Sequence, residues 1–115
     1  MVFMSHLVLK TKEIEKTLAF YNVLGIEFRE KETDPKKYTA SLWNGVTFEL
    51  CEAEDLSDVN LAFSITSFEH ALAELAARDL MLFDTRFERD GQDVVVVCDP
   101  EGRRVELTLF KPRGG

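Results

Sequence analysis

Two stretches of this chain follow one plan: LVLKTKEIEKTLAFYNVLGIEF (residues 7–28) and LAFSITSFEHALAELAARDLML (residues 61–82). They align without a gap at an offset of 54 residues. The matched positions are Leu7 and Leu61, Leu9 and Phe63, Ile14 and Phe68, Glu15 and Glu69, Leu18 and Leu72, Ala19 and Ala73, and Ile26 and Leu80. Because apolar residues recur at equivalent places, the pattern indicates an internal duplication.

The two copies also end alike, with GVTFEL (residues 45–50) in the first and GRRVEL (residues 102–107) in the second. The offset here is 57 residues, which implies a short insertion in the second copy. An internal duplication builds two like half-sites, so polar residues at matching positions can converge. His6 then corresponds to Asn60, and Glu49 corresponds to Glu106.

Length and composition predict a cytoplasmic protein of one domain. The chain has 115 residues, 45% of them hydrophobic, which is ordinary for one soluble domain. No stretch approaches the roughly 18 consecutive apolar residues of a membrane span, and the N-terminus lacks the pattern of a secretion signal. A net charge of −7 argues against binding nucleic acid through its phosphates. Cys51 and Cys98 are too few for a disulfide framework and are expected to be reduced core residues.

The first copy is predicted to fold as β-α-β-β-β. Alternating or continuous apolar residues indicate strands, and apolar residues at helical spacing indicate a helix. We expect strands at residues 4–10, 26–30, 38–43 and 46–51, and a helix at residues 13–24. Gly25 is placed to cap the helix, Asp34-Pro35 marks a turn, and Asn44-Gly45 predicts a hairpin turn in which both positions tolerate positive φ.

The second copy repeats the pattern after a polar linker at residues 53–58. We expect strands at residues 59–65, 80–84, 93–98 and 104–110, and a helix from Thr66 to about Arg78 with Phe68, Leu72 and Leu75 on its buried face. Thr66 and Glu69 form a predicted capping box. The run of four valines at residues 94–97 is apolar on both faces, which is typical of a central strand. The sequence DPEG (residues 99–102) predicts a type I turn, and the tail at residues 111–115 is expected to fray.

Strand alternation places four polar residues opposite the apolar faces that pack on the helices. Side chains of a strand point alternately to the two faces of its sheet. The more apolar faces carry Leu7 and Leu9 in one copy and Val105 and Leu107 in the other. The opposite faces carry His6, Glu49, Asn60 and Glu106, which therefore occupy equivalent places in the two copies.

Three motifs together are typical of one family: HLVL (residues 6–9), LAFYNVLG (residues 18–25) and DPEGRRVEL (residues 99–107). Through them the chain resembles the vicinal oxygen chelate superfamily, which includes glyoxalase I, extradiol dioxygenases and bleomycin resistance proteins. The resemblance implies an α+β fold in which two tandem βαβββ modules form a cupped mixed sheet with helices on its outer face. Residues 1–115 would be one glyoxalase-like domain, with module one at 1–52, module two at 59–110 and a homodimer as the assembly.

The resemblance also implies a metal site. His6, Glu49 and Glu106 match three ligand positions, and Asn60 stands where glyoxalase I has a histidine. One imidazole and two carboxylates can bind a divalent metal such as Zn²⁺, Ni²⁺, Mn²⁺, Fe²⁺ or Co²⁺, and no organic cofactor is indicated. Glu106, and secondarily Glu49, would be the base of a lyase or isomerase acting on a small oxygen-chelating substrate. The alternative is a metal-free binding protein of the bleomycin resistance type, which Asn60 favours.

Each candidate residue also has a purely structural interpretation. His6 is equally read as a half-buried strand histidine, and Glu49 and Glu106 as residues of a solvated sheet face. Tyr38 and Trp43 either line a ligand pocket or pack in the core. Arg29, Arg86 and Arg89 are candidates for binding a ligand's carboxylate or phosphate, and nothing in the sequence selects among them.

Overall fold

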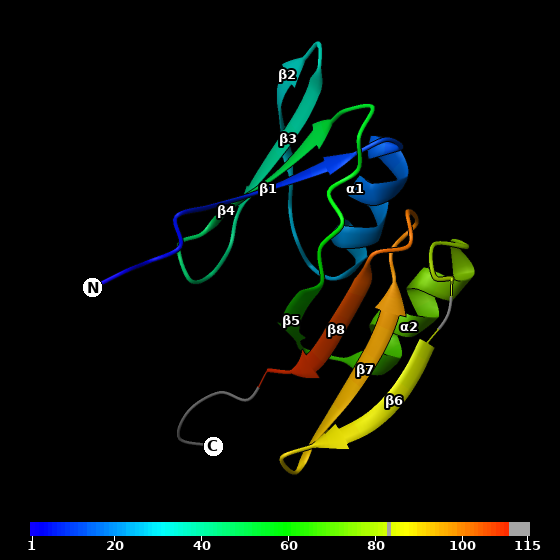
Figure 1. The fold of residues 1–115 in the computed structure, drawn as a ribbon. Helices are drawn as coiled ribbons and strands as arrows, with labels where there is room; N and C mark the ends of the chain where they lie inside the picture. The colour runs from blue at the N-terminus through cyan, green and yellow to red at the C-terminus, as the bar shows by residue number, and fades with distance from the viewer. Residues whose placement is uncertain (83, 111–115) are drawn as a thin grey trace. The chain divides into compact units, whose positions relative to one another are not determined.

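The computed structural model describes residues 1–82 and 84–110. The chain divides into two compact units, with the boundary between Ser57 and Asp58. Unit 1 comprises β1 (His6–Thr11), α1 (Ile14–Val23), β2 (Arg29–Thr33), β3 (Lys36–Ser41) and β4 (Thr47–Glu52). Unit 2 comprises β5 (Leu61–Ile65), α2 (Phe68–Ala77), β6 (Asp84–Arg89), β7 (Gln92–Cys98) and β8 (Arg104–Leu109). The predicted α+β fold of two tandem βαβββ modules is confirmed (Figure 1).

The sheet of unit 1 has the strand order β1-β4-β3-β2. β1 runs parallel to β4, and the other neighbours are antiparallel. The helix α1 lies against one face of this sheet (Figure 1), and that face carries the fully buried Leu9, Phe48 and Leu50. Phe20 and Tyr21 of α1 complete this core, with the Tyr21 and Phe48 ring centroids 5.5 Å apart. The strand faces therefore alternate as the sequence predicted.

The sheet of unit 2 repeats this order as β5-β8-β7-β6, with β5 parallel to β8. Val105 and Leu107 of β8 are fully buried. β7 lies between β8 and β6, and the side chains of Val94, Val95, Val96 and Val97 are at most 1% exposed. The prediction that the valine run forms a central strand is confirmed.

The residues after each helix were assigned wrongly to strands. The chain leaves α1 through Gly25 at φ +106°, and the Ile26 N–H then donates to the Tyr21 carbonyl at 3.3 Å. Leu80 does the same in unit 2, donating to the Leu75 carbonyl at 2.9 Å. Both side chains are buried, so each anchors a helix end instead of beginning a strand. β2 starts at Arg29, three residues later than predicted.

The strand predicted at residues 80–84 is instead β6 at Asp84–Arg89; Phe83 lies outside the described residues. Its position is set by a turn that was not among those predicted. Asp90 and Gly91 have φ of 52° and 75°, the two positive values of a type I′ hairpin turn. Arg89 consequently pairs with Gln92, and the register continues without a break to Asp84 and Val97.

The N-cap of α2 is Ser67 and not Thr66 as predicted. The helix begins at Phe68, so the Ser67 hydroxyl is the one that accepts a hydrogen bond from the His70 N–H, at 3.2 Å. Glu69 lies in the first turn of α2, where its charge favours the helix dipole. The buried face consists of Phe68, Ala71 and Leu75, while Leu72 is half-buried.

The hairpin between β3 and β4 has a longer loop than the predicted Asn44-Gly45 turn. The Leu42 N–H donates to the Val46 carbonyl at 2.8 Å, and the Gly45 N–H donates to the Leu42 carbonyl at 3.0 Å. Gly45 has φ +84°, and Asn44 is not in the positive-φ region. Three residues thus form the loop, and Trp43 stands at its tip with 98% of its surface exposed. The turn between β2 and β3 contains Asp34-Pro35, joined by a cis peptide bond.

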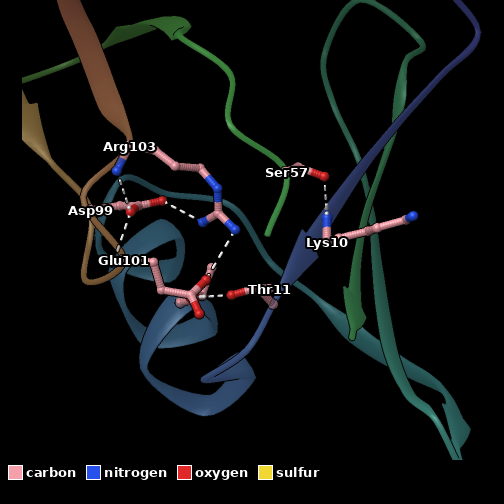
Figure 2. Close-up of polar contacts among 7 residues, drawn as sticks. Lys10, Thr11, Ser57, Asp99, Glu101 and Arg103 are labelled. Carbon is pink, nitrogen blue, oxygen red and sulfur yellow. Dashed lines mark hydrogen bonds and ion pairs between the residues drawn. The ribbon is translucent and has the colours of Figure 1, made fainter. Parts of the chain in front are cut away.

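A buried ionic cluster holds the turn between β7 and β8 (Figure 2). The Gly102 N–H donates to the Asp99 carbonyl at 2.9 Å, which closes the predicted turn. Asp99 Oδ1 accepts the N–H groups of Glu101 and Arg103, each at 3.0 Å. The Arg103 guanidinium then donates to Asp99 Oδ2 at 2.7 Å and to Glu101 Oε2 at 3.0 Å. We call these three residues the Arg103 cluster.

Three remaining predictions concern the cysteines, membrane spans and the tail. Cys51 and Cys98 are free thiols, and both are half-buried rather than core residues. Neither helix in the described part of the chain is long and apolar enough to cross a membrane. The tail at residues 111–115 lies outside the described residues.

Candidate functional site

In each unit, the sheet face turned away from the unit's own helix, here called the far face, carries the predicted site residues. In unit 1 the strand register forms a straight row across this face, with Val8 next to Glu49, Glu49 next to Thr39, and Thr39 next to Arg29. His6 lies on the same face, two residues before Val8 on β1. His6 and Glu49 therefore lie on the sheet face that strand alternation predicted for them.

Glu49 is a nearly buried carboxylate beside two basic groups. Only 7% of its surface is exposed. The Glu49 Oε1 atom lies 3.8 Å from Nε2 of His6 and 3.6 Å from Nζ of Lys31. A carboxylate withdrawn from water needs such compensation, because an unpaired buried charge is costly. Lys31 was not among the candidates from the sequence.

A β-bulge in β2 explains how Lys31 comes to Glu49. Glu30 pairs with Tyr38, but Glu32 pairs with Lys37, so Lys31 is an extra residue in the ladder. Regular pairing would have set Lys31 opposite Lys37, two like charges face to face. The bulge instead gives Lys37 an acidic partner, with its Nζ 3.6 Å from Glu32 Oε2. Lys31 is left to reach Glu49.

In unit 2 the equivalent carboxylate, Glu106, is held by two arginines. The Arg89 guanidinium donates to both Glu106 oxygens, at 2.9 and 3.4 Å, and Nη2 of Arg104 lies 3.5 Å from Glu106 Oε1. The hydrogen bond from Arg89 lowers the pKa of Glu106 below its usual value, partial burial opposes this, and the charges of both arginines lower it further. Glu106 is thus held as an anion.

The structure places the other predicted residues as follows. Asn60 is exposed and directly precedes β5, where Ala62 is the residue paired with Glu106. Tyr38 pairs with Leu50 on the helix-bearing face of unit 1, and its hydroxyl donates to Glu15 Oε1 of α1 at 3.2 Å. Arg86 stacks over the Phe68 ring at 5.1 Å from its centroid.

The donor set does not fit a divalent metal ion. Within residues 1–82 and 84–110, no group of three or more His, Cys, Asp or Glu side chains is arranged to hold one. His6 and Glu49 come together in unit 1, but Lys31 already compensates the carboxylate. Glu106 is engaged by Arg89 and Arg104 in unit 2. A metal ion would have to displace these basic side chains from both carboxylates, and the positive charge they carry opposes its entry.

Unit 1 has a cavity of about 650 Å³ at the start of β2 and the end of β3. It is lined by residues 25–29, residues 39–43 and Thr47. Trp43, predicted to bind ligand, is part of this lining, whereas Tyr38 is not. Arg29, Thr39, Ser41 and Thr47 also belong to the lining, and in the described part of the chain the side chain of none of these four has a hydrogen-bonding or ionic partner. The cavity therefore offers donors that the protein does not use.

Solved structures share the whole fold. Oxidase ChaP-H1 is 19% identical over 100% of both chains, with a TM-score of 0.74. The fosfomycin resistance protein FosX of Listeria monocytogenes is 19% identical, with 96% of this chain and 94% of that chain covered and a TM-score of 0.73. A glyoxylase/bleomycin resistance protein/dioxygenase domain from Frankia sp. EAN1pec is 16% identical, with 96% and 99% covered and a TM-score of 0.69.

Sequence comparisons give no such match: no family model matches the chain, and no curated protein does. Since the structural relatives are below 25% identity, they establish the fold and leave the chemistry open. The chain has the fold of the vicinal oxygen chelate superfamily, as the resemblance of its sequence predicted.

Proposed function

We propose that this chain binds a small organic molecule in the unit 1 cavity without the help of a metal ion. The proposal rests on the size of the cavity. Its volume of about 650 Å³ lies within the range of roughly 300–1,000 Å³ that is typical of ligand sites. Its lining combines an exposed indole with polar side chains that have no hydrogen-bonding or ionic partner among the described residues, and such polar groups can fix the orientation of a ligand. The name of the structural relative FosX, a fosfomycin resistance protein, supports a role in small-molecule binding on this fold.

Trp43 makes the proposal directly testable, because it is the one tryptophan of the chain and lines the cavity. We expect at least one member of a library of small organic molecules to change its fluorescence saturably, with the same affinity in buffer and in EDTA. The binding of the same compound to Trp43→Phe is measured by calorimetry, which does not depend on fluorescence and so separates binding from mere quenching of Trp43. No saturable binding by any compound, or binding that EDTA abolishes and metal restores, would contradict the proposal.

The alternative is a metal-dependent lyase or isomerase, and the contact between His6 Nε2 and Glu49 Oε1 at 3.8 Å favours it. It is tested by metal content after incubation of untagged protein with Mn²⁺, Ni²⁺, Zn²⁺ and Co²⁺ in turn. Near-stoichiometric metal that is lost in His6→Ala would replace our proposal with this one. Under our proposal neither protein retains metal, because the carboxylates already have basic partners.

We also expect a cytoplasmic homodimer, as the superfamily resemblance implies. Sedimentation equilibrium of the purified chain measures the assembly. A mass of one chain, 13.2 kDa, at all concentrations would rule the dimer out and leave the cavity proposal untouched, since every lining residue belongs to unit 1.

A further inference from the structure

Arg29 differs from the other basic side chains on the far face of unit 1. Lys10 pairs with Asp55 at 3.3 Å, Lys31 with Glu49 at 3.6 Å, and Lys37 with Glu32 at 3.6 Å. Among residues 1–82 and 84–110, none forms an ion pair with Arg29. The chain has 21 acidic and 14 basic residues, so a guanidinium without a carboxylate is unexpected in it. The Arg29 guanidinium therefore lines the cavity without an ion-pair partner among the described residues, and Glu27 is the one acidic residue of the same lining.

The surroundings of Arg29 are suited to an anion. Its register partner Thr39 lies beside it on the sheet, and Ser41 and Thr47, which pair with each other across β3 and β4, continue the same lining. Hydroxyl groups donate to an anion as readily as they accept. A guanidinium binds a carboxylate through two parallel hydrogen bonds, which fixes the orientation of the ligand as well as its charge.

Trp43 supplies a planar apolar wall at the same cavity. The three-residue loop between β3 and β4 presents the indole at its tip, 98% exposed. Aromatic rings pack favourably in offset-stacked arrangements, so the exposed indole suits a flat, conjugated partner.

We propose that the ligand of the unit 1 cavity is a planar aromatic monoanion, specifically an aromatic carboxylate, with Arg29 binding the carboxylate and Trp43 stacking on the ring. The inference rests on the proposed binding function and deepens it by naming the ligand class. The one guanidinium of the lining suits one carboxylate, and Glu27 in the same lining disfavours a second negative charge on the ligand. A cavity of about 650 Å³ accommodates a ligand of one or two fused rings.

Matched ligands and variants test the inference by calorimetry. The probes are 1-naphthoate and its neutral amide, which differ in charge, and cyclohexanecarboxylate, which keeps the charge without the ring. We expect 1-naphthoate to bind at least about tenfold more tightly than either. Arg29→Gln should abolish the preference for the acid over the amide, and Arg29→Lys should retain part of it, since lysine keeps the charge without the planar fork. Trp43→Leu should abolish the preference for the aromatic acid over cyclohexanecarboxylate.

The control is Lys16→Gln, which removes the same charge from α1, where Lys16 pairs with Glu13 at 3.5 Å; it should bind like the parent protein. All the substituted side chains are exposed, and circular dichroism confirms folding. Equal binding of acid and amide, or a preference unchanged in Arg29→Gln, would overturn the inference while leaving a binding cavity. If 1-naphthoate fails to bind while a different class of molecule binds, the inference is wrong and the proposed function stands. Binding of no molecule at all contradicts both.

Discussion

Arg103→Met is expected to destabilise the protein strongly, because Arg103 holds two carboxylates in a buried place. The Arg103 side chain is 1% exposed, and those of Asp99 and Glu101 are 0% and 6% exposed. Methionine retains much of the stem and its packing but removes the charge. Asp99 Oδ2 then loses its donor at 2.7 Å and Glu101 Oε2 its donor at 3.0 Å. Breaking a buried pair by removing one partner costs about 3–5 kcal/mol, a large part of the roughly 5–15 kcal/mol that stabilises a typical domain.

Urea denaturation followed by far-ultraviolet circular dichroism measures this loss. The matched control is the triple variant Asp99→Asn, Glu101→Gln, Arg103→Met, which removes all three charges together. It should recover at least about half of the loss, because the cost of the single change lies in buried carboxylates that have lost their guanidinium partner. The asparagine Oδ1 can still accept the two backbone N–H groups that Asp99 Oδ1 accepts. A loss below about 1 kcal/mol for the single variant, or no recovery in the triple variant, would refute the reasoning.

Three further predictions concern single groups. Gly45→Ala should cost about 1–2 kcal/mol, because Gly45 has φ +84° while an added Cβ meets no atom within 4 Å; urea denaturation measures it, and an unchanged midpoint would contradict it. Burial and the hydrogen bond to Glu15 raise the pKa of Tyr38 above 10.0. The neutral phenol therefore stabilises the fold below pH 10.0, and this contribution is lost as the pH rises through the folded-state pKa. Glu15→Gln should lower that pKa in a phenolate absorbance titration. Arg89→Gln should raise the pKa of Glu106 towards 4.5. In the parent protein the ionised Glu106 stabilises the fold above pH 4.5, and this contribution is lost as the pH falls through its lower folded-state pKa. A carboxyl titration by NMR that finds the two proteins alike would contradict this.

The sheet faces could be predicted from the sequence, because strand alternation is set by local geometry. Leu9 and Phe48 pack towards α1, and Glu49 lies on the opposite face, as the period of two requires. The strand boundaries at Arg29 and Asp84 could not be read from hydrophobicity alone. Ile26 and Leu80 are apolar in either role, and only the hydrogen bonds that close the preceding helices show that they belong to the helix ends.

The partners of the candidate carboxylates were harder to predict than the carboxylates themselves. The turn Asp90-Gly91 was a usable signal for Arg89, since it fixes the pairing of β6 with β7 and so brings Arg89 to the face that carries Glu106. Lys31 gave no such signal, because a bulge depends on the pairing of two strands. Trp43 belongs to the lining of the cavity, but its exposure depends on a loop of three residues and not two.

The β-bulge in β2 makes chain length, as much as residue type, a determinant of the charges on the far face. Loss of one residue between Arg29 and Glu32 would remove the bulge, and Glu32 would still pair with Lys37. The remaining residue, Glu30 or Lys31, would then oppose Tyr38 on the face towards α1, because side chains alternate along a strand, and Glu49 would lose its lysine partner. When relatives of this chain are compared, a gap of one residue at this place therefore marks a different electrostatic surface, even where every aligned residue is the same.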